Sequence, residues 1–131
     1  MNKAKLVSVV FATLATAVCA AELDLSDFDD DVMRAMDDNI KALDGNVAGQ
    51  DADAAAVDVK SLQQGIDWTA RYFANKQGAP EASRLAAEAR TSLEALAIAI
   101  AAKDFTAADD HLRATARNCK ACHDLYRSPY L

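Results

Sequence analysis

Glycine, proline and aromatic residues are scarce in this chain. Its 131 residues include four glycines, two prolines and one tryptophan, and aromatic side chains make up 6%. Glycine and proline are the strongest local breakers of regular structure. No segment shows the sustained two-residue alternation of a half-buried strand, whereas apolar residues recur at helical spacing almost throughout. The sequence therefore predicts an all-α protein.

A long apolar run is also missing. The run from 6 to 18 is too short to span a bilayer, which needs roughly 20 residues. It follows Lys3 and Lys5 and ends at the small residues Cys19 and Ala20, as in a secretory signal peptide. We expect cleavage after Ala20, with a lipid anchor on Cys19 as the alternative. Residues 1–20 then direct export to the periplasm, and residues 21–131 form one domain.

Basic residues are outnumbered, with 14 Lys and Arg against 20 Asp and Glu. Two of the basic residues and none of the acidic ones precede position 21, so removing the signal peptide changes the formal charge from −6 to −8. Nucleic acid is not expected as a partner, because duplex binding depends on basic patches that meet phosphates. A partner protein with a basic docking surface is favoured, although an acidic surface also serves solubility.

Only Cys119 and Cys122 remain after cleavage. Exported proteins often use cysteines as disulfides that close long loops. A bridge across two intervening residues would constrain very little of the chain. This pair therefore points to a different use.

Four helices are expected. The first is capped at Ser26 and loosens over 45–50, and the second runs from Asp51 to the break at 76–80. The third spans 81–103, and the fourth begins at 104–106 and ends at Ser128–Pro129. Short connections predict an antiparallel up-down-up-down bundle. Many of its inward positions are alanine, which leaves room for a flat apolar cofactor between helices.

The sequence Cys119-Lys-Ala-Cys122-His123 matches the attachment signature of c-type haem. Each cysteine sulfur forms a thioether with one haem vinyl group, and the histidine binds the iron. On a helix these positions are i, i+3 and i+4 and share one face. A zinc site would need more ligands, and only His111 remains as a second histidine. A thioredoxin-like pair would follow a strand, and a plain disulfide leaves His123 without a role.

A haem motif near the end of a four-helix chain, continuing as His123-Asp-Leu-Tyr-Arg127, resembles the class II cytochromes c. This family includes cytochrome c prime and low-spin, methionine-ligated relatives. The resemblance implies one covalent haem c with His123 as proximal ligand. It also implies an aromatic residue near the haem, for which Trp68 is the candidate, and a basic residue at Arg127. Ordinary core packing is the alternative for Trp68.

The sixth iron ligand separates an electron carrier from a gas binder. After cleavage the chain keeps two methionines, Met33 and Met36, both on the first helix, where this family builds the distal side. Met33 is favoured because it precedes Arg34, as in the low-spin relatives, and Met36 is the alternative. Core packing of both methionines stays open. Arg34 and Arg127 are candidates for haem propionates, with surface ion pairs as the alternative.

The sequence thus predicts a four-helix bundle that carries haem c on its last helix and transfers electrons without acting as an enzyme. The alternative function is a five-coordinate haem protein that binds nitric oxide or carbon monoxide. Peroxidase activity lacks an evident acid-base residue on the distal helix. Monomer and homodimer both remain open.

Overall fold

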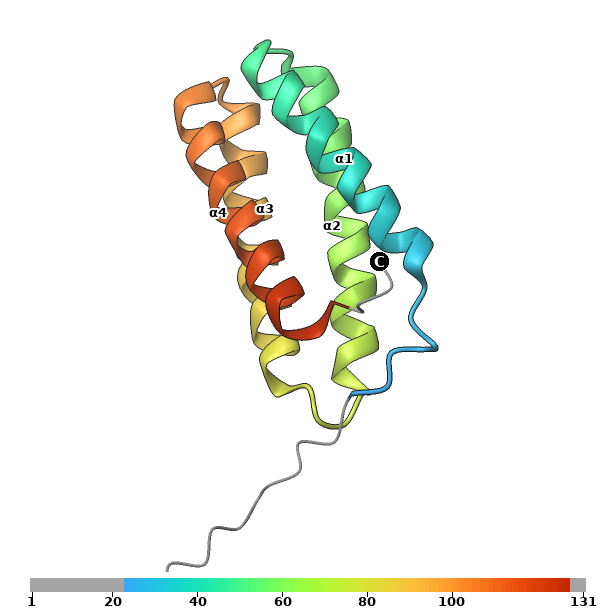
Figure 1. Cartoon of the computed structure of the whole chain (residues 1–131). Helices are drawn as coiled ribbons and strands as arrows, with labels where there is room; N and C mark the ends of the chain where they lie inside the picture. Colours follow the sequence, from blue (N-terminus) through green and yellow to red (C-terminus); the bar gives the residue numbers. More distant parts are fainter. Residues whose placement is uncertain (1–22, 128–131) are drawn as a thin grey trace, which may run out of the picture.

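The computed structural model describes residues 23–127, and within this range it contains four helices and no strand. They are α1 (Asp30–Ala48), α2 (Ala52–Ala74), α3 (Pro80–Ala101) and α4 (Phe105–Tyr126) (Figure 1). The predicted signal peptide and the stop at Ser128–Pro129 lie outside the described residues. The prediction of an all-helical chain with four helices is confirmed.

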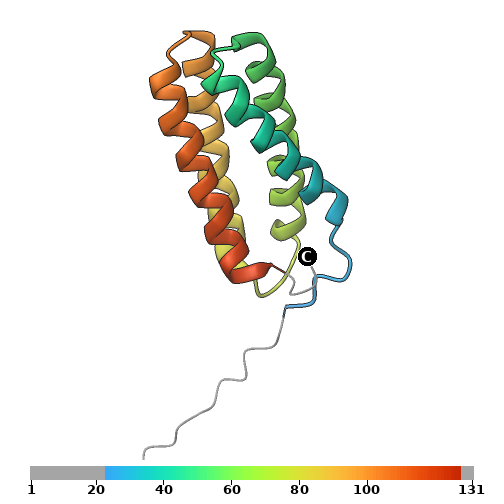
Figure 2. The ribbon, with the colours of Figure 1, turned by 45° about the horizontal axis from the view of Figure 1, so that its top comes forward.

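Consecutive helices run in opposite directions and pack side by side, and α1 also contacts α4, which closes the ring of a four-helix bundle (Figure 2). The α1–α4 contact is the smallest of the four. None of the helices between residues 23 and 127 is long and apolar enough to cross a membrane. The amino end of α1 and the carboxyl end of α4 lie at the same end of the bundle, the lower end in Figure 1.

Aspartates begin three of the helices. The side chains of Asp29, Asp51 and Asp104 each accept a hydrogen bond from a backbone N–H of the following turn, which satisfies a donor that the helix itself leaves free. The predicted cap at Ser26 was wrong. Its N–H donates to Oδ1 of Asp24 at 2.9 Å, and the helix starts four residues later.

α1 ends at Ala48, within the predicted range of 45–50, and the backbone then turns at Gln50, which has a φ of 57°. α3 ends at Ala101, before the predicted Lys103, because Lys103 adopts a φ of 56°. The left-handed conformation interrupts the helical hydrogen-bond pattern at both places.

Every helix buries one stripe of apolar side chains, as the periodicity predicts. The largest fully buried apolar side chains come from α1, α2 and α3 and form one core: Leu43, Val59, Leu62, Leu93, Leu96 and Ile100. On α4 the same core is completed by Ala108 and Leu112. On α4 this core ends at Leu112, whereas on α1 it reaches Met36.

A second, smaller cluster closes the opposite end. It is built around Phe73 and includes Phe28 from the segment before α1 and Tyr126 from the end of α4. Phe28 was predicted to lie on the first helix, but it precedes the helix and packs edge-on against Trp68 and Tyr72 of α2.

Three polar side chains hold the segment before α1 against α2. The carboxylate of Asp27 accepts hydrogen bonds from the Tyr72 hydroxyl at 2.6 Å and from the Lys76 ammonium at 2.7 Å. Burial, and then the bond to Asp27, raises the pKa of Tyr72. This amino-terminal clamp (Asp27, Tyr72 and Lys76) fixes where the chain enters α1.

Gly45 lies inside α1 with open space around it, since no atom would come within 4 Å of a Cβ added there. Replacing it with alanine should stabilise the protein by about 0.5–1 kcal/mol, because glycine loses more conformational freedom than alanine when a helix forms. Chemical denaturation of both proteins measures this difference. An unchanged or lower stability would contradict the assignment of Gly45 to the interior of α1.

Candidate functional site

Both cysteines of the sequence motif lie on the inward stripe of α4. The stripe steps through Ala108, Leu112 and Thr115, which are buried, and then through Cys119 and Cys122, which are half-buried. The side chains of this stripe are therefore fully buried in the first half of α4 and only partly buried at the turn formed by Cys119, Cys122 and His123, here called the motif turn. This turn lies between the first core, which ends at Leu112, and the second cluster, which contains Tyr126.

The two thiols are free and partly desolvated. Burial raises the pKa of both, and the neighbouring Cys122 raises that of Cys119 further. A redox-active pair of the thioredoxin type has a lowered thiol pKa instead, so that a thiolate is available at neutral pH. The electrostatics of this site therefore favour two neutral thiols.

His123 follows on the side of α4 that faces α1. Its side chain is exposed, and its pKa is lowered first by partial loss of solvent and then by the positive charge of Arg127. Asp37 of α1 and Asp124 act in the opposite direction. The imidazole is therefore biased toward the neutral form, the form that binds a metal ion.

α1 and α4 diverge toward the motif turn (Figures 1 and 2). The carboxyl end of α1 lies close to the amino end of α4 at the upper end of Figure 2. The two helices separate toward the opposite end, where α1 begins and α4 ends. Two carboxylates of α1 raise the pKa of basic residues on α4 by their negative charge. Asp37 has this effect on His123, and Asp44, seven residues later, has it on Arg113. The α4-facing side of α1 therefore includes the line through Asp37 and Asp44.

The structure separates the two methionines. Met36 is buried and lies against Gly65 of α2: a Cβ added to Gly65 would come within 2.5 Å of Met36 Cγ and 2.6 Å of its Sδ. Met33 is half-buried at the edge of the first core. It precedes Asp37 by four residues and so shares the side of α1 that faces α4. Met36 therefore contacts α2, whereas Met33 lies on the side of α1 that faces α4.

The remaining predicted site residues lie elsewhere. Arg34 is exposed and forms an ion pair with Asp31, the alternative given for it. Trp68 is half-buried and stacks on Tyr72 at 5.7 Å between ring centroids, with Phe28 edge-on at 5.0 Å. Its aromatic neighbours therefore belong to α2 and the segment before α1.

Two further basic residues were considered from the sequence. Arg127 is exposed and ends α4, donating its N–H to the carbonyl of His123 at 3.0 Å. His111, the second histidine, is half-buried.

Gly65 and Asp37 were missed as site residues. An isolated glycine inside a helical pattern often marks close packing, and Gly65 is the one glycine within the periodic part of the second helix, so the signal for it was present. The proximity of Asp37 to His123 depends on the placement of α1 against α4, which no local pattern reports.

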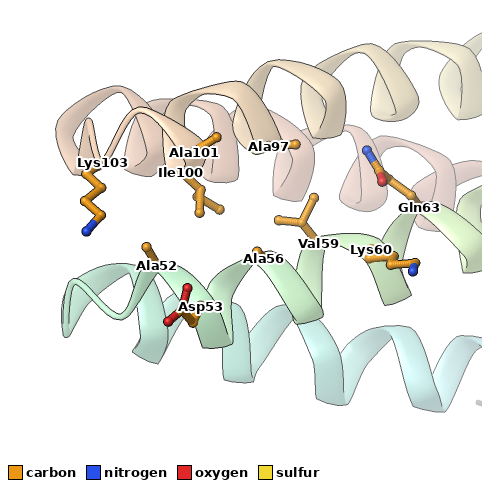
Figure 3. Close-up of a pocket in the computed structure, with 10 residues that line it drawn as sticks. All are labelled: Ala52, Asp53, Ala56, Val59, Lys60, Gln63, Ala97, Ile100, Ala101 and Lys103. Atoms are coloured by element: carbon orange, nitrogen blue, oxygen red, sulfur yellow. The ribbon is translucent and has the colours of Figure 1, made fainter.

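A groove between α2 and α3 lies at the end of the bundle remote from the motif turn (Figure 3). Alanines at 52, 56, 97 and 101 line it, with Val59 and Ile100 between them and Lys60 and Lys103 at its edges. It contains none of the predicted site residues.

Within residues 23–127, no three histidine, cysteine or carboxylate side chains come together as a metal-ion site. The donors at the motif turn are two thiols and one imidazole on a single helical turn, with a thioether on the facing helix. This set fits haem c, since two thiols can form the thioethers and an imidazole and a methionine are established axial ligands of haem iron. Comparison of the chain with protein-family models, curated proteins and solved structures gives no match.

Alkylation of the haem-free protein tests the burial of the thiols. Because folding raises both thiol pKa values, modification by iodoacetamide should reach its half-maximal rate at a higher pH than in the chain unfolded by denaturant. Mass spectrometry of peptides with Cys119 and Cys122 measures each rate. A folded-state midpoint at or below the unfolded one would show a thiolate-stabilising site of the redox type instead.

Proposed function

We propose that this protein is a periplasmic mono-haem cytochrome of the class II type, which transfers electrons and does not transform a substrate. The observation that carries the proposal is the motif turn. Two half-buried thiols and an imidazole share one face of α4, at the end of the bundle where α1 and α4 diverge. A bound haem c would supply an iron that alternates between the ferrous and ferric states.

Each residue of the motif turn has one task. Cys119 and Cys122 would hold the cofactor edge by thioether bonds, each formed when a thiol adds across a vinyl group. His123, whose pKa is lowered by desolvation and by Arg127, would be the proximal ligand. The half-buried thiols lie on the inward face of the helix, so the cofactor would enter the space between α1 and α4.

Met33 would be the distal ligand, because it lies on the side of α1 that faces α4. A soft thioether favours the ferrous form and keeps the iron low-spin. Little then has to rearrange when an electron arrives or leaves. The predicted signal peptide supports export, and a formal charge of −8 without it supports a redox partner with a basic docking surface.

A second function is favoured by one observation: Met33 also packs against the first core. If this packing retains the Met33 side chain, the iron keeps an open position, and the protein binds nitric oxide or carbon monoxide. Electron transfer is the function that we put first, because Met33 is only half-buried and can turn toward α4 without leaving a buried cavity.

The optical spectrum of the purified holoprotein distinguishes the two functions. We expect sharp, split visible bands on reduction, little changed by carbon monoxide, because His123 and Met33 would both hold the iron and leave no place for the gas. Broad bands with an immediate shift after addition of the gas would establish the open iron and the gas-binding function.

Substitution of the methionines assigns the distal ligand. Met33→Ala should convert the low-spin spectrum to a high-spin one and allow carbon monoxide to bind, since the thioether is lost. Met36→Ala is the matched control, one turn away, and should leave the spin state unchanged while lowering stability through the lost core contact. A low-spin Met33→Ala protein together with a high-spin Met36→Ala protein would reverse the assignment.

A further inference from the structure

Gly65 lies in the interior of α2, where alanine would form the helix more favourably. The nearest atoms to a Cβ at this position would be Met36 Cγ at 2.5 Å, Met36 Sδ at 2.6 Å and Met36 Cε at 3.6 Å. All three belong to one side chain. α2 therefore has no Cβ at the point where Met36 of α1 packs against it.

The Met36 thioether occupies the space that a side chain at position 65 would need. Met36 is only 8% exposed, and its sulfur lies against the α2 backbone because no side chain at 65 displaces it. A real Cβ essentially never lies within 3.0 Å of another heavy atom, so a side chain at position 65 and the present place of Met36 exclude each other. The excluded atoms form a flexible, unbranched side chain, which can move to a different rotamer while the backbone stays.

Met33 makes no comparable contact with a glycine and lies on the neighbouring part of the α1 surface, toward α4. The two thioethers are one turn apart and chemically identical, so a site that takes one of them needs a structural reason to reject the other. The position of Gly65 provides that reason.

We propose that Gly65 is a positioning residue that selects the distal ligand: it retains the Met36 thioether against α2 and leaves Met33 as the thioether presented to the haem. This inference rests on the proposed function. It adds that the choice between the methionines is made on α2, by a residue that would contact neither the cofactor nor the iron.

The contact itself is tested by a double-mutant cycle on thermal stability. Gly65→Ala should lower the melting temperature, although alanine favours a helix. The loss should be smaller or absent when Met36→Ala is also present, because the shorter side chain at position 36 leaves room for the new methyl group. Gly45→Ala is the control, since the same substitution in open space should raise the melting temperature. Additive effects of Gly65→Ala and Met36→Ala would overturn the proposal.

Ligand selection is tested in the holoprotein by the spin state of the iron. Met33→Ala should be high-spin, and Met33→Ala/Gly65→Ala should regain a low-spin fraction, because the methyl group at 65 displaces the Met36 thioether toward the iron. The triple variant that also carries Met36→Ala should be high-spin again. This return of the high-spin state identifies Met36 as the source of the regained ligand.

Two results contradict the inference in different ways. If Met33→Ala/Gly65→Ala stays as high-spin as Met33→Ala while the stability cycle shows coupling, Gly65 only packs against Met36, and the proposed function stands. If Met33→Ala has the wild-type spectrum, Met33 is not the ligand, and the methionine assignment and the selecting role of Gly65 fall together.

Discussion

The proposed site depends on one constraint: a single turn of α4 has to place two thiols and an imidazole together on the inward side of the bundle. Helical geometry meets the constraint, because positions i, i+3 and i+4 share a face. The same geometry assigns these positions to the stripe that would otherwise pack the core. From Cys119 onward the stripe is only half-buried, whereas Ala108, Leu112 and Thr115 before it are buried. The site thus replaces core packing at this end of the bundle.

Different interactions hold the bundle together on the two sides of the motif turn. On one side the first core, rich in leucine and isoleucine, closes the bundle up to Leu112. On the other, Phe73 of α2 contacts Tyr126 of α4 with ring centroids 5.7 Å apart, and the amino-terminal clamp fixes the entry to α1. Supports on both sides can keep α1 and α4 apart where the cofactor would lie. Aromatic contacts suit this role, because large rings bridge helices that small side chains could not.

Much of the fold could be predicted from the sequence because its signals are local and periodic. The apolar residues of α3 that recur at helical spacing are buried: Leu85, Ala89, Leu93, Leu96 and Ile100. The errors occurred at helix ends, where Asp29 rather than Ser26 is the cap and Phe28 leaves the helix to join the aromatic cluster. Such choices depend on tertiary contacts that propensity does not report.

The candidate site likewise has a part that the sequence predicts and a part that depends on contacts between helices. The motif turn is visible in the sequence, because its residues are neighbours along the chain. The two methionines could not be separated by spacing alone, since the difference between them is the contact of Met36 with Gly65 of another helix. The influence of Asp37 on His123 is likewise set by how α1 lies against α4. Relations between helices are what the sequence could not supply.

The most direct test of the central claim is the intact mass of the protein, exported from cells that attach haem c and then denatured. We expect the mass of residues 21–131 increased by one haem, and the unmodified mass when Cys119 and Cys122 are both replaced by alanine. An unmodified mass for the wild-type protein under the same conditions would contradict the assignment of the motif turn as a haem attachment site.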